Sequence, residues 1–418
     1  MSSRILAHYL IETAHDPARA AEIMAGEQSA GTFVKVPGET PELLERYGAR
    51  VDAIKDVESV GVPSLPGSKL PKEHDGLYRR AEVTLSFPFE NIGASLTSLF
   101  TTVAGNLFEL SAFSGLKLLD IQIPPAYAEA YPLPAFGIEG TRRLAGVWVR
   151  PIIGTIIKPS VGLSPQQTAD LVKTLCEAGI NFIKDDELQT DSPHSPLAER
   201  VTAVMQVIND YADKTGKKVM YAFNVTGDLD QMRRGHDLVL EHGGTCIMVN
   251  MLSVGLVGVL ELRRHSQLPI HGHRAGWGMF SRDPSLGIAY TAFQQFFRLA
   301  GVDHLHVNGL QNKFCETDES VTASARACLT PMPGIGAVVM PVFSSGQTAR
   351  QAPDTYSSLN SVDLIYLAGG GIMAHPDGPA AGVRSLQQAW EAALQDTPLN
   401  AYAATHAELA RALERFRV

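Results

Sequence analysis

Eight short apolar segments recur at regular intervals through the last two thirds of the chain, and helical stretches separate most of them. Strands that alternate with helices over about 260 residues predict a (β/α)8 TIM barrel with a parallel sheet. The alternative, an open doubly wound sheet, calls for a glycine fingerprint after the first strand, and Val161-Gly162-Leu163 is not one. The expected strands are 152–158, 182–187, 219–226, 246–252, 269–274, 304–308, 338–344 and 364–369.

Helix-start signals fall between several of these segments. Ser164 and Gln167 have the spacing of a capping box, and Asp228 is a suitable N-cap for a later helix. A third helix is expected to begin at Asp283-Pro284, because proline is favoured in the first helical turn. These signals support the alternating pattern.

Residues 1–137 have a different organisation, with strands clustered rather than alternating regularly with helices. This pattern is typical of an α+β domain, and we expect a ferredoxin-like one. A proline-rich link at 123–134 marks the boundary, so the barrel domain is expected at 138–418. The elements expected before the link are strands at 5–13 and 79–87 and helices at 16–26 and 95–103.

Composition limits the classes of function. The chain has 418 residues, of which 45% are hydrophobic and 19% charged, as in a globular protein with a sizeable core. A formal net charge of −9 argues against nucleic acid or an acidic membrane as the main partner, but not against a small anionic substrate. No apolar run predicts a signal peptide or a membrane span, so we expect a cytoplasmic location with reduced cysteines.

The second predicted strand runs directly into a lysine and three carboxylates. Successive side chains of a strand alternate between faces, so Lys184 and Asp186 point the same way, and Glu187 joins them where the strand bends. Carboxylate oxygens favour a hard divalent cation, with Mg²⁺ first among candidates. An ammonium would repel the metal, whereas a lysine amine that has reacted with CO₂ becomes a carbamate and supplies a third anionic oxygen. The alternative is a strand-end cluster of salt bridges.

Nearly every other predicted strand also ends in a polar group, and the C-terminal strand ends of a barrel form its active site. The glycine run at 369–371 lets backbone N–H groups approach a phosphate, and Arg274 offers a bidentate contact to a second anion. Lys313 lies in a loop that could close as a lid. Read as structure alone, the glycines form a turn and Lys313 is solvated. The further strand-end groups are Lys158, Asn224, Asn250, His273, His306, Asn308, Ser344, Ser345 and Gly346.

Several of these segments resemble the large chain of ribulose-bisphosphate carboxylase/oxygenase (RuBisCO), and they do so in the right order. The N-terminal part takes part as well, so the resemblance covers nearly the whole chain. The matching segments are Glu-Gln-Ser-Ala-Gly-Thr-Phe at 27–33, Gly-Asn at 105–106, Gly-Thr-Ile-Ile-Lys-Pro at 154–159, Phe-Ile-Lys-Asp-Asp-Glu at 182–187, His-Gly-His-Arg-Ala at 271–275, Asp-His-Leu-His at 303–306 and the glycines at 369–371.

The resemblance implies a homodimer with two composite sites and no small subunit. Lys184 would carry the carbamate formed with CO₂ and would bind Mg²⁺ together with Asp186 and Glu187. The implied catalytic residues are Lys158, Lys184, His273 and Lys313. The implied substrate-binding residues are Arg274, His306 and Ser345 at one anionic end, the backbone of Gly346, Gly369 and Gly370, and, from the N-terminal domain of the other subunit, Glu27, Thr32, Phe33 and Asn106.

Departures from the carboxylase pattern argue against CO₂ fixation. A carboxylase has a second lysine where this chain has Ser160 and a histidine where it has Trp277. The residues around Lys313 differ from the carboxylase loop, including the segment Phe314-Cys315-Glu316, and Gln347 replaces a second glycine. The chain therefore resembles the RuBisCO-like proteins, which share the metal and enolate chemistry without the carboxylation.

The chemistry common to these proteins is formation of an enediolate next to a carbonyl, which Mg²⁺ stabilises. The resemblance favours decarboxylation of 3-oxo-isoapionate 4-phosphate, a phosphorylated keto sugar acid of D-apiose catabolism. Two alternatives belong to methionine salvage: enolisation of 2,3-diketo-5-methylthiopentyl 1-phosphate and isomerisation of 5-methylthioribulose 1-phosphate. In either one, Trp277 and Phe314 would line the methylthio tail. A non-catalytic regulatory role is the third hypothesis, and it predicts loss of the metal ligands.

Overall fold

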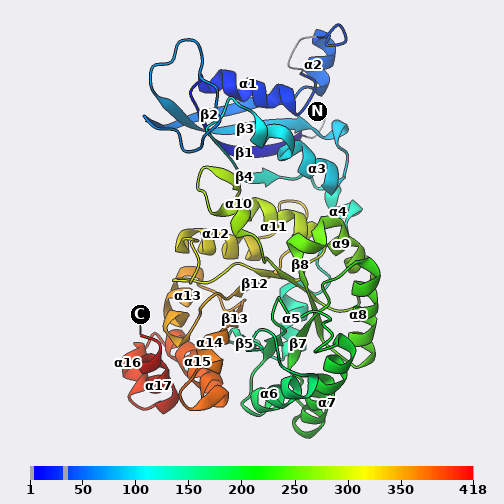
Figure 1. Ribbon diagram of the computed structural model, residues 1–418, viewed down its shortest axis with the longest axis vertical. Coiled ribbons are helices and arrows are strands. Elements are labelled where there is room, and N and C mark those ends of the chain that lie inside the picture. Colours follow the sequence, from blue (N-terminus) through cyan, green and yellow to red (C-terminus); the bar gives the residue numbers. More distant parts are fainter. Residues whose placement is uncertain (1–3, 32–35, 418) are drawn as a thin grey trace. The chain divides into compact units, whose positions relative to one another are not determined.

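The computed structural model describes residues 4–31 and 36–417, which form two compact units (Figure 1). The smaller unit contains the chain up to residue 131 together with 277–296 and 333–335. The larger unit contains the rest of the chain from residue 132 onward. Residues 277–296 thus belong to the smaller unit, although they lie far from the N-terminal residues in the sequence.

The smaller unit is built on a mixed sheet, which the described strands form in the order β10-β4-β1-β3-β2. β1 lies between β3 and β4 and is antiparallel to both, and its alternate residues Ile5, Ala7, Tyr9 and Ile11 are fully buried. The predicted α+β class is confirmed. The elements are β1 (Arg4–Thr13), α1 (Pro17–Glu27), α2 (Pro41–Tyr47), β2 (Arg50–Val60), β3 (Tyr78–Pro88), η1 (Phe89–Asn91), α3 (Leu96–Val103), η2 (Gly105–Glu109), β4 (Gly115–Gln122), α4 (Ala126–Ala130), α10 (Gly278–Ser281) and β10 (Leu286–Ile288).

The helix predicted to begin at Asp283 begins later. Residues Leu286–Ile288 form β10, which pairs in parallel with β4, and the Leu116 N–H donates to Ser285 O (2.7 Å). Gly287 has a φ of 95°, which is outside the helical region. Helix α11 then starts at Tyr290. Pairing with the distant strand β4 satisfies the backbone hydrogen-bonding groups of this segment. No local sequence pattern predicts this pairing.

In the described part of the chain, eight parallel strands close into a barrel in the order β11-β12-β13-β5-β6-β7-β8-β9. Each lies within one of the apolar segments of the sequence, so the predicted TIM barrel is confirmed. The strands are shorter than predicted, because polar residues near several predicted C-terminal ends, such as Lys158, Asp186 and Ser344, belong to the loops that follow. Their bounds are β5 (Ile152–Ile156), β6 (Phe182–Lys184), β7 (Met220–Asn224), β8 (Cys246–Asn250), β9 (Ile270–His273), β11 (His304–His306), β12 (Met340–Phe343) and β13 (Ile365–Leu367).

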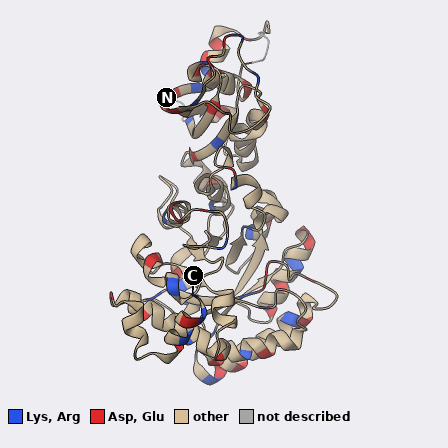
Figure 2. Ribbon diagram, turned by 60° about the vertical axis from the view of Figure 1, so that its left-hand side comes forward, with Lys and Arg blue, Asp and Glu red and all other residues tan. Residues whose placement is uncertain are grey.

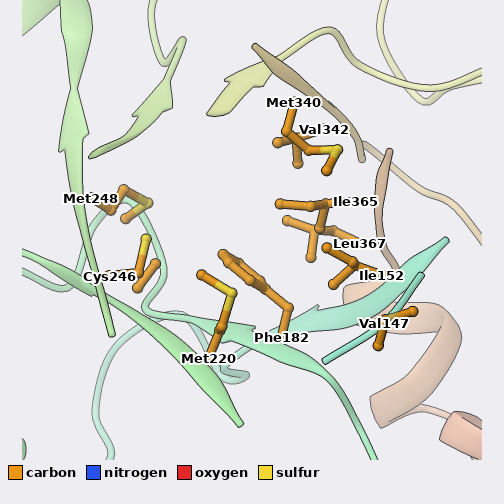
Figure 3. Packing of buried hydrophobic residues seen from close by; sticks show 11 residues of the cluster. Val147, Ile152, Phe182, Met220, Cys246, Met248, Met340, Val342, Ile365 and Leu367 are labelled. Carbon is orange, nitrogen blue, oxygen red and sulfur yellow. The ribbon is translucent and has the colours of Figure 1, made fainter. Parts of the chain in front are cut away.

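An apolar cluster fills the barrel near the N-terminal strand ends (Figure 3). Members such as Met220 and Ala222, two residues apart on one strand, face the interior together. Burying each large aliphatic side chain contributes about 1.5–3 kcal/mol. Ile138 and Leu144 of helix α5 (Gly137–Ala145) pack against this cluster, so α5 covers the N-terminal strand ends and leaves the C-terminal ends for polar groups.

Helices surround the barrel, and two of them begin where their predicted capping residues lie. The capping boxes of Ser164 with Gln167 and of Asp228 with Gln231 are both present. Basic and acidic residues are interspersed along the outer helices (Figure 2). Among the described residues, no helix is both long and apolar enough to cross a membrane. The helices are α6 (Pro165–Glu177), α7 (Leu197–Thr215), α8 (Leu229–Glu241), α9 (Met251–His265), α11 (Tyr290–Leu299), α12 (Asp318–Leu329), η3 (Ala349–Gln351), α13 (Ala352–Leu359), α14 (Gly369–Met373), α15 (Gly378–Leu394), α16 (Leu399–Ala403) and α17 (Ala407–Arg415).

Candidate active site

Lys184 is the last residue of β6, and its side chain is completely buried. Its Nζ donates to Asp185 O (2.6 Å) and lies 3.6 Å from Glu187 Oε2. Burial lowers the pKa of Lys184, and the carboxylates of Glu187 and Asp186 partly offset this shift. A lysine with a lowered pKa loses its proton more readily, and only the neutral amine reacts with CO₂.

Asp185 faces a different set of groups from its neighbours. Its carboxylate accepts hydrogen bonds from Tyr221 Oη (2.6 Å) and the Asn224 N–H (2.9 Å) and pairs with Arg200 (3.2 Å). Burial raises the pKa of Tyr221 well above its usual value, so the phenol remains a donor. Asp185 thereby anchors the strand end that carries Lys184 and Asp186.

Two asparagines hold the backbone at the bend after β6. Asn224 Nδ2 donates to Asp186 O (3.3 Å) and Glu187 O (3.2 Å), and Asn250 Nδ2 donates to Glu187 O (2.9 Å). The sequence identified both asparagines only as polar strand ends. Their role depends on β7 and β8 lying in order beside β6, which the barrel closure provides.

Basic groups face the two carboxylates that follow. Lys158 Nζ lies 2.5 Å from Asp186 Oδ2 and donates to Ser160 Oγ (2.8 Å). His273 Nε2 lies 3.6 Å from Glu187 Oε2. Burial alone would raise the pKa of Glu187, but the positive charges of the nearby Lys184 and Lys158 oppose this effect, and the pKa of Glu187 is lowered. Burial and the nearby Lys184 lower the pKa of His273, so its imidazole is neutral.

The side chains of Lys184, Asp186 and Glu187 fit Mg²⁺ if Lys184 carries a carbamate. Asp186 and Glu187 supply carboxylate oxygens, which Mg²⁺ prefers. Glu187 Oε2 lies 3.6 Å from Lys184 Nζ, and the carboxylate of Asp186 interacts electrostatically with the same lysine. An ammonium at Lys184 would oppose a cation, whereas a carbamate there would complete a set of three anionic oxygen ligands. Lys184, Asp186 and Glu187 would hold the ion in that form.

A chain of buried histidines runs through the barrel interior to the site. His304 Nδ1 lies 3.3 Å from His271 Nδ1, and His271 Nε2 lies 2.7 Å from His306 Nε2. His306 Nδ1 in turn lies 3.1 Å from Ser344 Oγ. Burial lowers the pKa of all three rings, so they are neutral at physiological pH. The ring centres of His306 and His273 lie 4.4 Å apart. The row of buried histidines therefore holds both rings in place at the site.

Arg274 is paired with an acidic side chain that the sequence did not identify as a site residue. Glu316 forms an ion pair with Arg274, and Asn308 Nδ2 donates to the same carboxylate (2.6 Å). Ser345 Oγ donates to Asn308 Oδ1 (2.7 Å). The expected anion-binding group therefore lies beside a carboxylate of the chain itself. In the sequence, the one indication of a role for Glu316 is that it belongs to a segment that differs from the carboxylase loop.

The loop that carries Lys313 is tethered to the loop after β12. The Lys313 N–H donates to Ser345 O (3.1 Å), and a Cβ on Gly346 would lie 3.5 Å from Lys313 Cβ. Gly346 has a φ of 92°, which favours glycine. Lys313 Nζ lies 5.2 Å from the centre of the Phe314 ring. The structure thus brings Lys313, Ser345 and Gly346 together.

The glycine run forms the start of α14. A Cβ at Gly370 would meet nothing within 4 Å, whereas one at Gly371 would lie 2.6 Å from Gln347 O. Gly371 is therefore required by packing, and Gly370 has open space in front of it. A Cβ at Gly369 would lie 3.6 Å from Lys158 Cε, so the glycine run and Lys158 lie side by side.

The residues expected from the other subunit belong to the smaller unit. Glu27 ends α1 and Asn106 lies in η2, whereas Thr32 and Phe33 lie outside the described residues. With its amide oriented to satisfy both neighbours, Gln28 donates to a carbonyl of α3 (3.2 Å) and accepts from the Asn106 N–H (3.0 Å). Gln28 therefore ties the end of α1 to Asn106, a link that the sequence did not reveal.

Comparisons with known proteins agree along the whole chain. Residues 137–416 match the family described as the ribulose bisphosphate carboxylase large chain, catalytic domain, and residues 2–127 match the N-terminal domain of the same family. A solved rubisco-like protein from Burkholderia fungorum superposes with a TM-score of 0.91 at 48% identity, over 99% of this chain and 100% of that one.

Two curated relatives cover nearly the full length. A Xanthobacter autotrophicus protein named 3-oxo-isoapionate-4-phosphate transcarboxylase/hydrolase is 56% identical over 418 residues, which is 100% of both chains. A Rhizobium etli protein named 3-oxo-isoapionate-4-phosphate decarboxylase is 47% identical over 410 residues, which is 98% of this chain and 97% of that protein. This chain belongs to the RuBisCO large-chain family, as one of its RuBisCO-like proteins.

Proposed function

We propose that this chain is an Mg²⁺-dependent carboxy-lyase that decarboxylates 3-oxo-isoapionate 4-phosphate and does not fix CO₂. The observation that carries the proposal is the full-length identity of 47–56% to relatives named for this one substrate. The approach of Lys158 to Asp186 and of Lys184 to Glu187 supports it, and so does Ser160 at the position of the second carboxylase lysine. We place the enzyme in the cytoplasm.

The substrate is a 3-oxo acid, so its carboxylate lies β to a ketone. Breaking the carbon–carbon bond to the carboxylate releases CO₂ and leaves the electron pair as an enediolate, which then takes up a proton. Bound Mg²⁺, held by Asp186, Glu187 and the carbamate of Lys184, would stabilise the negative charge that develops at the ketone. The protein groups must therefore hold the two ends of the substrate and deliver one proton.

We assign that proton to Lys158, because its Nζ lies between Asp186 and Ser160, beside the glycine run. The neutral His273 and His306 suit hydrogen bonds to substrate hydroxyls, since neither adds a charge. The backbone of Gly369 and Gly370, with that of Gly346, would bind the phosphate. Lys313 would face the departing carboxylate, and Arg274 and Ser345 would lie at the far end of the substrate.

A second candidate reaction is favoured by the 56% identity to the relative named a transcarboxylase/hydrolase. Both reactions begin by breaking the bond to the carboxylate and differ in the fate of that group. Substrate labelled with ¹³C in the carboxylate separates them. A decarboxylase releases one equivalent of label as CO₂, whereas a transcarboxylase retains the label in an organic product. Failure to consume the substrate by either route would overturn the proposal.

The methionine-salvage alternatives are disfavoured by the place of Trp277. This side chain is buried against Phe293, with ring centres 4.4 Å apart, and it also contacts Tyr290 and Phe280. All four residues belong to the smaller unit, so Trp277 is engaged in an aromatic cluster of that unit. We therefore expect little enolisation of methylthio sugar phosphates, measured by exchange of solvent deuterium into the substrate.

We further propose a homodimer with composite sites and no small subunit, in which Glu27, Thr32, Phe33 and Asn106 of one subunit complete the barrel site of the other. A related archaeal RuBisCO from Hyperthermus butylicus, 29% identical with a TM-score of 0.84, is described as dimeric. Asn106→Ala and Lys184→Ala should each be inactive alone. Mixing them with subunit exchange should restore about a quarter of wild-type activity, because half of the dimers then contain one intact site.

The control is each variant exchanged with itself, which should remain inactive. Size-exclusion chromatography with light scattering confirms that the mixture is dimeric. A mixture with no more activity than its components, despite proven exchange, would mean that Asn106 and Lys184 of the same subunit serve the same site.

Gly370 provides a test of the phosphate contact. Gly370→Ala should leave stability unchanged because a Cβ there meets nothing within 4 Å. It should raise KM by about tenfold or more, since the added methyl group keeps the phosphate from the backbone. The matched control is Gly38→Ala in the smaller unit, where a Cβ also meets nothing. Equal KM values for both variants would place the phosphate elsewhere.

A further inference from the structure

The carboxylate of Glu316 is held by several partners on the larger unit. One of its oxygens contacts Arg274 and accepts from Asn308 Nδ2 (2.6 Å), and the other accepts from Ser320 Oγ (2.8 Å). The side chains of Arg274 and Glu316 are only 7% and 14% exposed. Both oxygens are thus used in a largely buried arrangement, which distinguishes Glu316 from a solvated acidic residue.

The arrangement joins three strand ends to the loop that carries Lys313. Arg274 directly follows β9, Asn308 follows β11, and Ser345 follows β12 and donates to Asn308 Oδ1 (2.7 Å). Glu316 lies three residues after Lys313, and its carbonyl accepts from Asn312 Nδ2 (3.1 Å). The carboxylate is therefore built into the rim of the barrel site, at the end that Arg274 marks.

This pairing changes the charge at that end of the site. An unpaired Arg274 would attract a phosphate, but here a full negative charge lies against its guanidinium. A phosphate brought to Arg274 would meet the carboxylate of Glu316 at close range, and like charges repel strongly where solvent is largely excluded.

We propose that Glu316 is a specificity-determining residue, which neutralises Arg274 so that this end of the site accepts a hydroxyl group rather than a phosphate. The enzyme is thereby restricted to sugar acids with a single phosphate, bound at the glycine run. The role deepens the proposed function and rests on it for the orientation of the substrate. The proposed substrate carries one phosphate, whereas a ribulose bisphosphate carries two, and Glu316 supplies the physical basis for that difference.

The test compares the binding of two probes, ribulose 5-phosphate and ribulose 1,5-bisphosphate, to the full-length protein with Mg²⁺ and bicarbonate. Calorimetric titration gives both dissociation constants for the wild type and for Glu316→Gln, which removes the charge at nearly constant size. The wild type should bind the bisphosphate no more tightly than the monophosphate. Glu316→Gln should shift the ratio of the two constants toward the bisphosphate by about tenfold or more.

The matched control is Glu319→Gln, which removes the same charge from an exposed position in the first turn of α12 and should leave the ratio unchanged. Glu316→Ala is a second variant, in case Glu316→Gln is poorly folded, and it should shift the ratio the same way. An unchanged ratio in every folded Glu316 variant, or an equal shift in Glu319→Gln, would overturn the role. Because binding is measured without turnover, this outcome is separate from failure to decarboxylate the proposed substrate.

Discussion

Lys184→Ala is expected to lower kcat/KM for decarboxylation by at least about 10³-fold, because the proposed metal site then loses one of three anionic ligands and several kcal/mol of charge stabilisation. The side chain is completely buried and its Nζ lies 3.6 Å from Glu187 Oε2, so the substitution removes a group directly beside this carboxylate. Lys184→Glu restores a negative charge with shorter reach and should recover only a small part of the activity. Steady-state assays with saturating Mg²⁺ measure both effects.

The same site predicts activation by CO₂. Protein stripped of CO₂ and metal should gain activity on incubation with bicarbonate and Mg²⁺ together. The gain should increase with pH, because raising the pH through the pKa of a lysine increases the neutral amine that reacts. Burial lowers the pKa of Lys184, so activation should extend to lower pH than an exposed lysine would allow.

The control for the substitution is Lys173→Ala, which removes an exposed lysine of α6 and should leave both activity and activation unchanged. Mass spectrometry after trapping of the carbamate locates the modification. Full activity of the wild type in rigorously CO₂-free buffer, with an unmodified Lys184, would exclude the carbamate and leave Lys184 as an ordinary base.

Asp303→Ala is expected to have the largest effect on stability, lowering the free energy of unfolding by about 3–5 kcal/mol. The fully buried carboxylate accepts from the N–H groups of Phe136 (2.6 Å), Gly137 (2.9 Å) and Ile270 (2.9 Å) and pairs with the buried Arg263 (3.1 Å). Its removal leaves a buried cation and three backbone donors without this acceptor. Urea unfolding followed by circular dichroism measures the change.

The control is Glu139→Ala, on helix α5, whose exposed carboxylate pairs with the exposed Arg143. Exposed ion pairs contribute little, so this variant should unfold at the same urea concentration as the wild type. Asp303→Asn keeps the size of the side chain and part of its capacity to accept hydrogen bonds. Its free energy of unfolding should therefore lie between those of the wild type and Asp303→Ala. An Asp303→Ala protein as stable as Glu139→Ala would show that the barrel does not depend on this carboxylate.

The sequence by itself determined the barrel and showed that polar residues gather near the C-terminal ends of its strands. The apolar segments located all eight strands, because a buried parallel strand needs a nearly continuous apolar run. The capping residues Ser164 and Asp228 located the starts of two helices, because a cap acts on the residues of the first helical turn. Strand alternation also separated Asp185 from Lys184 and Asp186, and the structure pairs Asp185 with Arg200 on a different side. These are short-range effects, which the local order of residues encodes.

Only the tertiary structure decided which distant groups meet. β10 is a strand because β4 lies beside it, although its own residues suggested the start of a helix. Glu316 faces Arg274 across 42 residues of chain, and Asn250 supports Glu187 across 63, because barrel closure places β9 beside β11 and β8 near β6. No periodicity or spacing encodes such pairs. Their geometry depends on which strand ends become neighbours when the barrel closes, and that depends on the packing of the whole unit.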